Sequence, residues 1–129
     1  MRAKILYVED NPLNIRLIKK MLKLMEVDMI EADNGQQGLA LANSSEPDLI
    51  LLDMHLPDID GLELAARIKD SQKLAHIPLV ALTADTGNAE ACRAAGCDGY
   101  LNKPVSSAYL LRTVMQFLKS ADTEPEMVR

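Results

Sequence analysis

The chain has 129 residues, 48% of them apolar, and a formal net charge of −5. This length suits one domain that buries roughly two thirds of its unfolded surface. The acidic balance, together with an aromatic content of 3%, argues against direct nucleic-acid binding. No apolar run approaches the roughly 18 residues of a membrane span, and the amino terminus leads straight into a predicted strand instead of a signal peptide. We therefore expect a cytoplasmic protein that contacts no membrane, or the cytoplasmic part of a larger one.

Short apolar runs alternate with segments of helical periodicity along the chain. Each run is rich in Leu, Ile or Val and ends at polar or turn-forming residues, which is typical of strands buried in a parallel sheet. The predicted strands are Lys4–Val8, Met29–Ala32, Asp48–Asp53, Ile77–Leu82 and Gly99–Leu101. The predicted helices are one that begins at Pro12, then Gln36–Asn43, Gly61–Asp70, Ala89–Ala95, and one from a Ser106 or Ser107 cap through Leu118.

The first helix carries apolar residues at helical spacing. Pro12 suits its first position, where an N–H group is not needed. The residues that are predicted to face the core are Leu13, Leu17, Met21, Leu24 and Met25.

Five strands that alternate with five helices predict a doubly wound α/β sandwich with a five-stranded parallel sheet. Short connections and right-handed crossovers favour the flavodoxin-like strand order 2-1-3-4-5. Residues 1–121 are expected to form this domain. Residues 122–129 are polar and contain Pro125, so a flexible C-terminal tail is expected there.

Polar residues follow the carboxyl ends of four predicted strands. Glu9 and Asp10 follow the first strand, Asp53 ends the third, Thr83 follows the fourth, and Lys103 follows the fifth. Parallel strands place these ends at one edge of the sheet, where ligands of open α/β sheets bind. Taken singly, each residue could be a helix cap, a strand end or a loop residue. Their joint placement at one edge favours a functional site.

Three carboxylates at one edge require a cation or raised pKa values. Two carboxylates about 4 Å apart repel by roughly 4 kcal/mol at an effective dielectric constant near 20. Glu9, Asp10 and Asp53 offer the oxygen ligands of a hard divalent cation, so Mg²⁺ or Mn²⁺ is predicted. Zinc is disfavoured, because neither histidine stands beside a cysteine or the other histidine.

This set of groups suits phosphoryl transfer. Asp53 can attack phosphorus through a carboxylate oxygen and form an aspartyl phosphate. Lys103 supplies a fixed positive charge and Thr83 a hydroxyl donor for the phosphoryl oxygens. Phosphoryl transfer depends mostly on such positioning and charge.

The chain resembles the receiver domain of two-component response regulators. The matching motifs are Glu9-Asp10-Asn11 with Asn14, Asp53 with Pro57 and Gly61, Thr83-Ala84, and Tyr100-Leu101-Asn102-Lys103-Pro104. They extend over residues 3–119 and suit a single-domain regulator and a receiver of a hybrid kinase equally well.

The resemblance implies a role for each matching residue. Asp53 would be the phosphoacceptor, supplied by a phosphohistidine on a sensor histidine kinase or a histidine phosphotransfer protein. Glu9 and Asp10 would bind Mg²⁺ together with Asp53 and the backbone carbonyl of His55. Lys103 would pair with the phosphate.

The resemblance also implies a switch. Thr83 and Tyr100 would be its two residues, and the peptide bond between Lys103 and Pro104 would be cis. The added charge would change the binding of a downstream protein at the face of the fourth helix, fifth strand and fifth helix. Thr83 and Lys103 are 20 positions apart, fewer than the family pattern implies, and the deficit falls before the fourth helix.

Such a protein is not an enzyme for a separate substrate, because it catalyses only its own phosphorylation and dephosphorylation. A receiver that serves as a phosphate-independent docking module is one alternative. A haloacid-dehalogenase-like phosphatase with an aspartyl nucleophile is another, but that family needs a second Asp where this chain has His55. A flavodoxin-like nucleotide or flavin binder is a third, and the Gly-rich phosphate loop that it needs does not follow the first strand.

Overall fold

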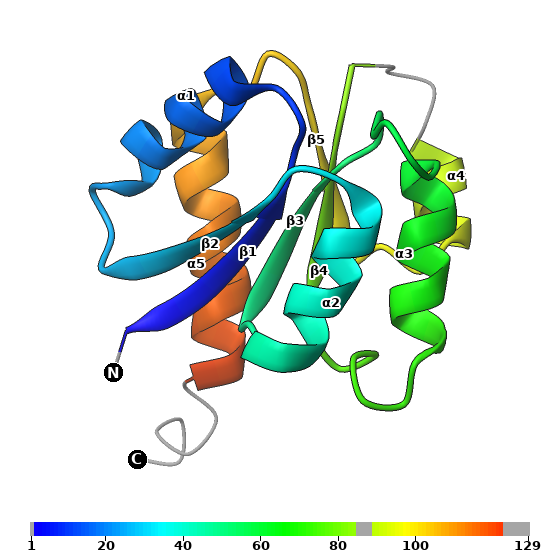
Figure 1. Ribbon diagram of the computed structural model, residues 1–129. Coiled ribbons are helices and arrows are strands. Elements are labelled where there is room, and N and C mark those ends of the chain that lie inside the picture. The colour runs from blue at the N-terminus through cyan, green and yellow to red at the C-terminus, as the bar shows by residue number, and fades with distance from the viewer. Residues whose placement is uncertain (1, 85–88, 123–129) are drawn as a thin grey trace.

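Five parallel strands form the central sheet of the computed structural model, which describes residues 2–84 and 89–122 (Figure 1). The strands are β1 (Ala3–Val8), β2 (Val27–Ala32), β3 (Leu49–Asp53), β4 (Leu79–Thr83) and β5 (Gly99–Asn102). Their order is β2-β1-β3-β4-β5, and every neighbouring pair is parallel. The predicted flavodoxin-like fold and strand order are confirmed.

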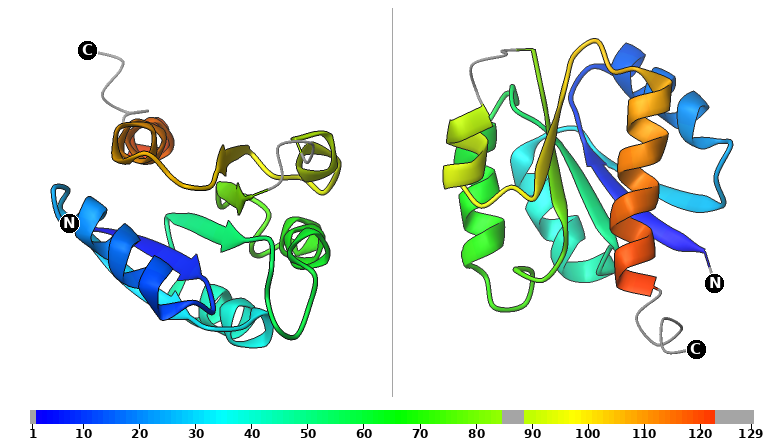
Figure 2. Two further views of the ribbon diagram at one scale, coloured as in Figure 1. Left: turned by 90° about the horizontal axis from the view of Figure 1, so that it is seen from above. Right: turned by 180° about the vertical axis from the view of Figure 1, so that it is seen from behind.

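The helices lie in two layers, one on each face of the sheet (Figure 2). They are α1 (Pro12–Leu22), α2 (Gly35–Ser45), α3 (Gly61–Asp70), α4 (Ala89–Ala94) and α5 (Ser107–Asp122). Helices α1 and α5 pack on one face, and α2, α3 and α4 pack on the other. Among the described residues, none of the helices is both long and apolar enough to cross a bilayer.

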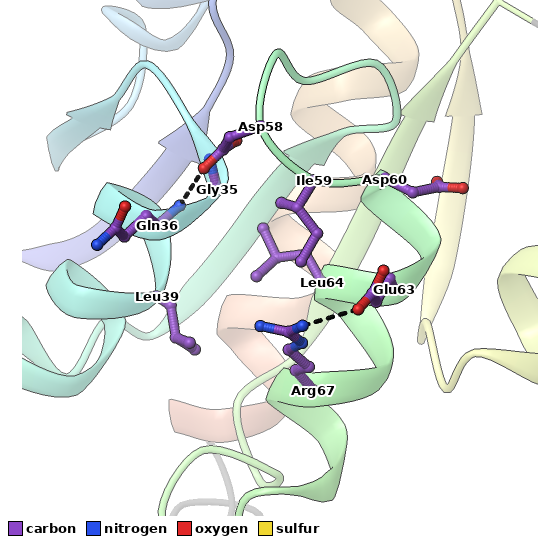
Figure 3. Close-up of a pocket in the computed structure, with 9 residues that line it drawn as sticks. All are labelled: Gly35, Gln36, Leu39, Asp58, Ile59, Asp60, Glu63, Leu64 and Arg67. Atoms are coloured by element: carbon purple, nitrogen blue, oxygen red, sulfur yellow. Dashed lines mark hydrogen bonds and ion pairs between the residues drawn. The ribbon is translucent and has the colours of Figure 1, made fainter.

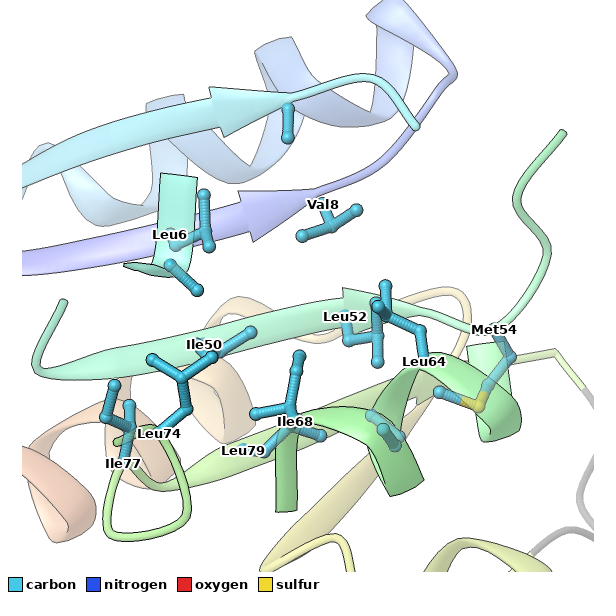
Figure 4. Packing of buried hydrophobic residues seen from close by; sticks show 14 of the residues in the cluster. Leu6, Val8, Ile50, Leu52, Met54, Leu64, Ile68, Leu74, Ile77 and Leu79 are labelled. Carbon is cyan, nitrogen blue, oxygen red and sulfur yellow. The ribbon is translucent and has the colours of Figure 1, made fainter. Parts of the chain in front are cut away.

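Strand β3 is buried along its whole length because helices cover both faces of the sheet. Leu52 lies on the side of α2 and α3, where it packs in one cluster with Leu64 and Ile68 (Figure 4). Leu51 lies on the side of α1 and α5. The strand that carries Asp53 is therefore fixed from both sides.

Some element boundaries differ from the prediction. Strand β2 begins at Val27, two residues earlier, where Arg2 donates a hydrogen bond to the Val27 carbonyl oxygen. Helix α5 runs through Asp122, so it extends past Leu118 into the first residue of the predicted tail. Residues 123–129 of that tail, and the shortened connection at residues 85–88, lie outside the described residues.

The predicted inward face of α1 is partly wrong. Leu13, Leu17 and Leu24 are 68%, 48% and 79% exposed, whereas Ile18 and Leu22 are buried. Two apolar stripes share this segment, and only the one that contains Ile18 and Leu22 packs on the sheet, with Met21 and Met25 half-buried beside it. Helix α1 also ends before Leu24. Periodicity shows that a helix carries apolar stripes, but it does not show which of two stripes the sheet covers.

Candidate functional site

Three carboxylates meet at the carboxyl edge of the sheet, as predicted. Glu9 and Asp10 directly follow β1, and Asp53 is the last residue of the neighbouring strand β3. One oxygen from each carboxylate lies within 4.8 Å of the other two. Glu9 and Asp53 are only 1% and 2% exposed, whereas Asp10 is exposed to solvent. The cluster is therefore open on the side of Asp10.

Lys103 is brought to this cluster from the end of β5. Its Nζ donates to Asp53 Oδ1 at 2.6 Å and to Glu9 Oε1 at 3.4 Å. Its backbone N–H donates to the Thr83 carbonyl oxygen at 2.8 Å, which fixes it against the end of β4. The peptide bond between Lys103 and Pro104 is cis, as expected.

Burial and charge perturb the acid–base behaviour of this pair. Burial is the main cause that raises the pKa of Asp53, and the charge of Glu9 adds to it, while the hydrogen bond from Lys103 opposes it. Burial lowers the pKa of Lys103, but the hydrogen bond and the charges of Asp53 and Glu9 outweigh it, so its pKa is raised. The ammonium group therefore stays charged beside a carboxylate that burial makes harder to ionise.

The donor set fits a divalent cation. When they are ionised, Glu9, Asp10 and Asp53 carry three negative charges and Lys103 carries one positive charge, which leaves two negative charges. An all-oxygen set of this charge suits Mg²⁺ or Mn²⁺. His55 lies two residues after Asp53, and its backbone pairs with that of Asp60 in an isolated antiparallel β-bridge.

A tight turn closes the loop that follows Asp53. The Gly61 N–H donates to the Met54 carbonyl oxygen at 3.1 Å. A Cβ atom at Gly61 would lie 2.5 Å from Met54 Cα, a distance that real Cβ atoms do not show, so only glycine fits there. The two ends of the loop are thereby held together beside the carboxylates.

Tyr7 also contacts the site, although the strand-end pattern of the sequence did not predict it. Its buried hydroxyl donates to Glu9 Oε1 at 2.9 Å. Burial, with the charge of Glu9, raises the pKa of Tyr7 far above its ordinary value, so the hydroxyl keeps the proton that it donates to Glu9. The signal in the sequence was the two-residue spacing of Tyr7 and Glu9 at the end of β1, which places both on one face where the extended backbone continues past Val8.

The two predicted switch residues lie in neighbouring strands. Thr83 is fully buried at the end of β4, in register with Asn102 of β5. Tyr100 is 40% exposed on β5 and lines a surface hollow together with Tyr109. The partly exposed ring of Tyr100 therefore lies at the surface of β5 next to α5.

Known proteins are similar to this chain in sequence and in fold. Residues 5–115 match the family model of the response regulator receiver domain. The chain is 37% identical over 123 residues to the polar-differentiation response regulator DivK of Brucella anthropi. The aligned region covers 94% of this chain and 100% of that relative.

Solved structures agree with this match. The receiver domain of the sensor histidine kinase PA1611 from Pseudomonas aeruginosa, solved with a magnesium ion coordinated in its active site cleft, is similar with a TM-score of 0.84 and 33% identity, over 92% of this chain and 98% of that one. The chemotaxis response regulator CheY4 of Vibrio cholerae gives a TM-score of 0.85 at 26% identity, over 92% of this chain and 100% of that one. The chain therefore belongs to the response regulator receiver family of two-component systems.

Proposed function

We propose that this protein is a signalling receiver that is switched by phosphorylation of Asp53. The main observation in support is the contact between Asp53 and Lys103 at 2.6 Å, beside the carboxylates of Glu9 and Asp10. Glu9, Asp10, Asp53 and the backbone carbonyl of His55 would hold Mg²⁺. The bound ion supplies positive charge that offsets the carboxylates and the oxygens of the incoming phosphoryl group.

Each protein group has a defined part in the transfer. A carboxylate oxygen of Asp53 attacks the phosphorus of a phosphohistidine, an O–P bond forms, and the P–N bond breaks with its electron pair leaving on the imidazole of the donor. Lys103 moves its ammonium group from Asp53 to a phosphoryl oxygen, and the hydroxyl of Thr83 donates to another. The protein would turn over no separate substrate, so it is not an enzyme in the ordinary sense.

Phosphorylation would change a binding surface. It adds about −1.5 to −2 charges at a site where carboxylates are already crowded. Rearrangement of Thr83 and Tyr100 would couple this added charge to the face formed by α4, β5 and α5. That face is suited to a protein partner, because Tyr100 and Tyr109 are 40% and 62% exposed and line one hollow on it. The partners would be a sensor histidine kinase or histidine phosphotransfer protein, and a downstream protein target.

Incubation with acetyl phosphate and Mg²⁺ is expected to add one phosphoryl group, detected by intact-mass spectrometry. Chelation of the metal should prevent the adduct, because the crowded carboxylates would then repel the donor. If the folded protein binds Mg²⁺ but gains no phosphoryl group from any donor, the phosphate-independent docking module replaces this proposal.

A surface beside the site is suited to the phosphodonor protein. Helix α1 begins two residues after Asp10, and exposed Leu13 and Leu17 lie one helical turn apart on it. Replacement of Leu17 by Gln should slow transfer from the donor protein about tenfold, as loss of a central apolar contact typically does. The rate with acetyl phosphate should stay unchanged, because that donor needs no docking surface.

The matched control is Leu24→Gln, because Leu24 is also an exposed leucine but lies beyond the far end of α1. Comparable slowing by Leu17→Gln and Leu24→Gln would show that the loss is not specific to the surface near Asp10. Slowing with acetyl phosphate as well would show damage to the site itself.

A further inference from the structure

The loop between β3 and α3 is tied to another helix by one carboxylate. Asp58 Oδ1 accepts a hydrogen bond from the Gly35 N–H at 2.7 Å, and Oδ2 accepts one from the Gln36 N–H at 2.9 Å (Figure 3). Both donors belong to the first turn of α2, which lies 22 or more residues before Asp58 in the chain. Each carboxylate oxygen therefore holds a different backbone group of the helix.

Asp58 completes the cap of α2. The first N–H groups of a helix have no partners within the helix. Asn34, the residue before α2, accepts a hydrogen bond from the Gln37 N–H at 2.8 Å. Asp58 accepts from the N–H groups of Gly35 and Gln36, which precede Gln37. These backbone hydrogen bonds lower the pKa of Asp58, and a negative charge is favoured at a helix amino terminus. Asp58 is thus a charged link between α2 and the loop.

Side-chain packing holds the same point of the loop. A Cβ atom at Gly35 would overlap Ile59 Cγ2, so α2 starts directly against the residue after Asp58. Ile59 and Leu64 form one wall of a hollow between α2 and α3, and Asp58 lies at its upper end (Figure 3). The loop is therefore fixed at Asp58 and Ile59, in addition to its closure by Gly61 and Met54.

We propose that Asp58 is a positioning residue of the metal site. The segment from Met54 to Pro57, which carries the His55 carbonyl, lies between Asp53 at the end of β3 and the anchor of Asp58 on α2. A carbonyl ligand binds a cation tightly only when its backbone is held in place beforehand, and groups that orient ligands affect metal affinity by about 10- to 100-fold. Asp58 touches neither the cation nor the phosphoryl group. This inference rests on the proposed function, because it takes His55 as a ligand.

The test compares Mg²⁺ affinity with stability, both without a phosphodonor. Isothermal titration calorimetry would measure Mg²⁺ binding to the wild-type protein, Asp58→Ala and Asp58→Asn, and thermal melting of the metal-free proteins would measure their stability. Asp58→Ala should weaken Mg²⁺ binding about tenfold. Asp58→Asn should weaken it less, because an amide oxygen still accepts one N–H. Asp58→Asn also serves as the test variant if Asp58→Ala does not fold.

The matched control is Asp48→Ala. Asp48 also accepts a backbone hydrogen bond, from the Lys4 N–H at 2.8 Å, but it lies at the opposite end of β3. The variant loses the same charge and a side-chain hydrogen bond to a backbone N–H, so it should melt at a lower temperature and bind Mg²⁺ normally. The titrations would be repeated in 1 M KCl, where the Debye length of about 3 Å removes the long-range attraction of an exposed carboxylate.

The positioning role is supported if the loss of Mg²⁺ affinity persists in 1 M KCl and is larger for Asp58→Ala than for Asp58→Asn. The inference is overturned if Asp58→Ala binds Mg²⁺ as the wild type does, or if its loss disappears in 1 M KCl or is matched by Asp48→Ala. Absence of Mg²⁺ binding by the wild-type protein is a separate outcome, because it would overturn the proposed function itself.

Discussion

Replacement of Asp53 by Asn is expected to abolish phosphoryl uptake and to stabilise the metal-free protein. The amide offers no carboxylate oxygen to attack phosphorus, so the phosphorylated species should vanish from the mass spectrum. Stability should rise because burial and the charge of Glu9 both disfavour ionised Asp53, which raises its pKa. Substitution by Asn removes that charge and keeps the size of the side chain.

The pH dependence of this gain has a definite sign. A carboxyl with a raised pKa holds its proton longer in the folded protein than in the unfolded chain, so stability falls as the pH rises from the ordinary value of 3.8 through the folded value. The gain from Asp53→Asn should be smallest near pH 3.8 and should grow as the pH rises. Melting curves in EDTA across this range would measure it. A gain that shrinks with rising pH would contradict the account.

Replacement of Lys103 by Met should weaken the fold and slow phosphorylation while strengthening Mg²⁺ binding. Removal of one partner of a buried ion pair costs about 3 kcal/mol. Lys103 is 22% exposed, so the loss should lie at or below that figure. The Mg²⁺ affinity should rise because the ammonium group no longer competes for Asp53. Phosphoryl uptake should slow because no fixed charge then meets the phosphoryl oxygens.

Three measurements separate these effects. Urea unfolding without metal should show the loss of stability, and unfolding with saturating Mg²⁺ should restore part of it, since the ion replaces the lost positive charge. Titration calorimetry should show tighter Mg²⁺ binding, and the rate with acetyl phosphate should fall. Lys103→Arg is the control that keeps the charge. Weaker Mg²⁺ binding by Lys103→Met would show that the ammonium group organises the carboxylates instead of competing with the ion.

The sequence predicted the sheet and the site edge because both depend on local patterns. The run Leu49–Asp53 is apolar until its last residue, so it could be read as a buried strand that ends in a carboxylate. The same reasoning placed Glu9 and Lys103 after strands, and parallel strands then bring such residues together. The structure joins them as predicted, with Lys103 in contact with both Asp53 and Glu9.

Contacts between distant segments could not be predicted in this way. The anchor of Asp58 on Gly35 and Gln36 depends on how closely the loop approaches α2, which no periodicity encodes. The exposure of Leu13 and Leu17 depends on which stripe of α1 the sheet covers. The Asp58 contact and the orientation of α1 both depend on how the whole domain packs.

The central claim is that Asp53 itself carries the phosphoryl group. Sodium borohydride reduces an aspartyl phosphate to homoserine, so the modified residue can be located by peptide sequencing in a mass spectrometer. After incubation with acetyl phosphate and Mg²⁺, homoserine should appear at position 53, while Glu9 and Asp10 remain unchanged. Reduction at Asp10, or a phosphoryl group that resists borohydride, would contradict the account.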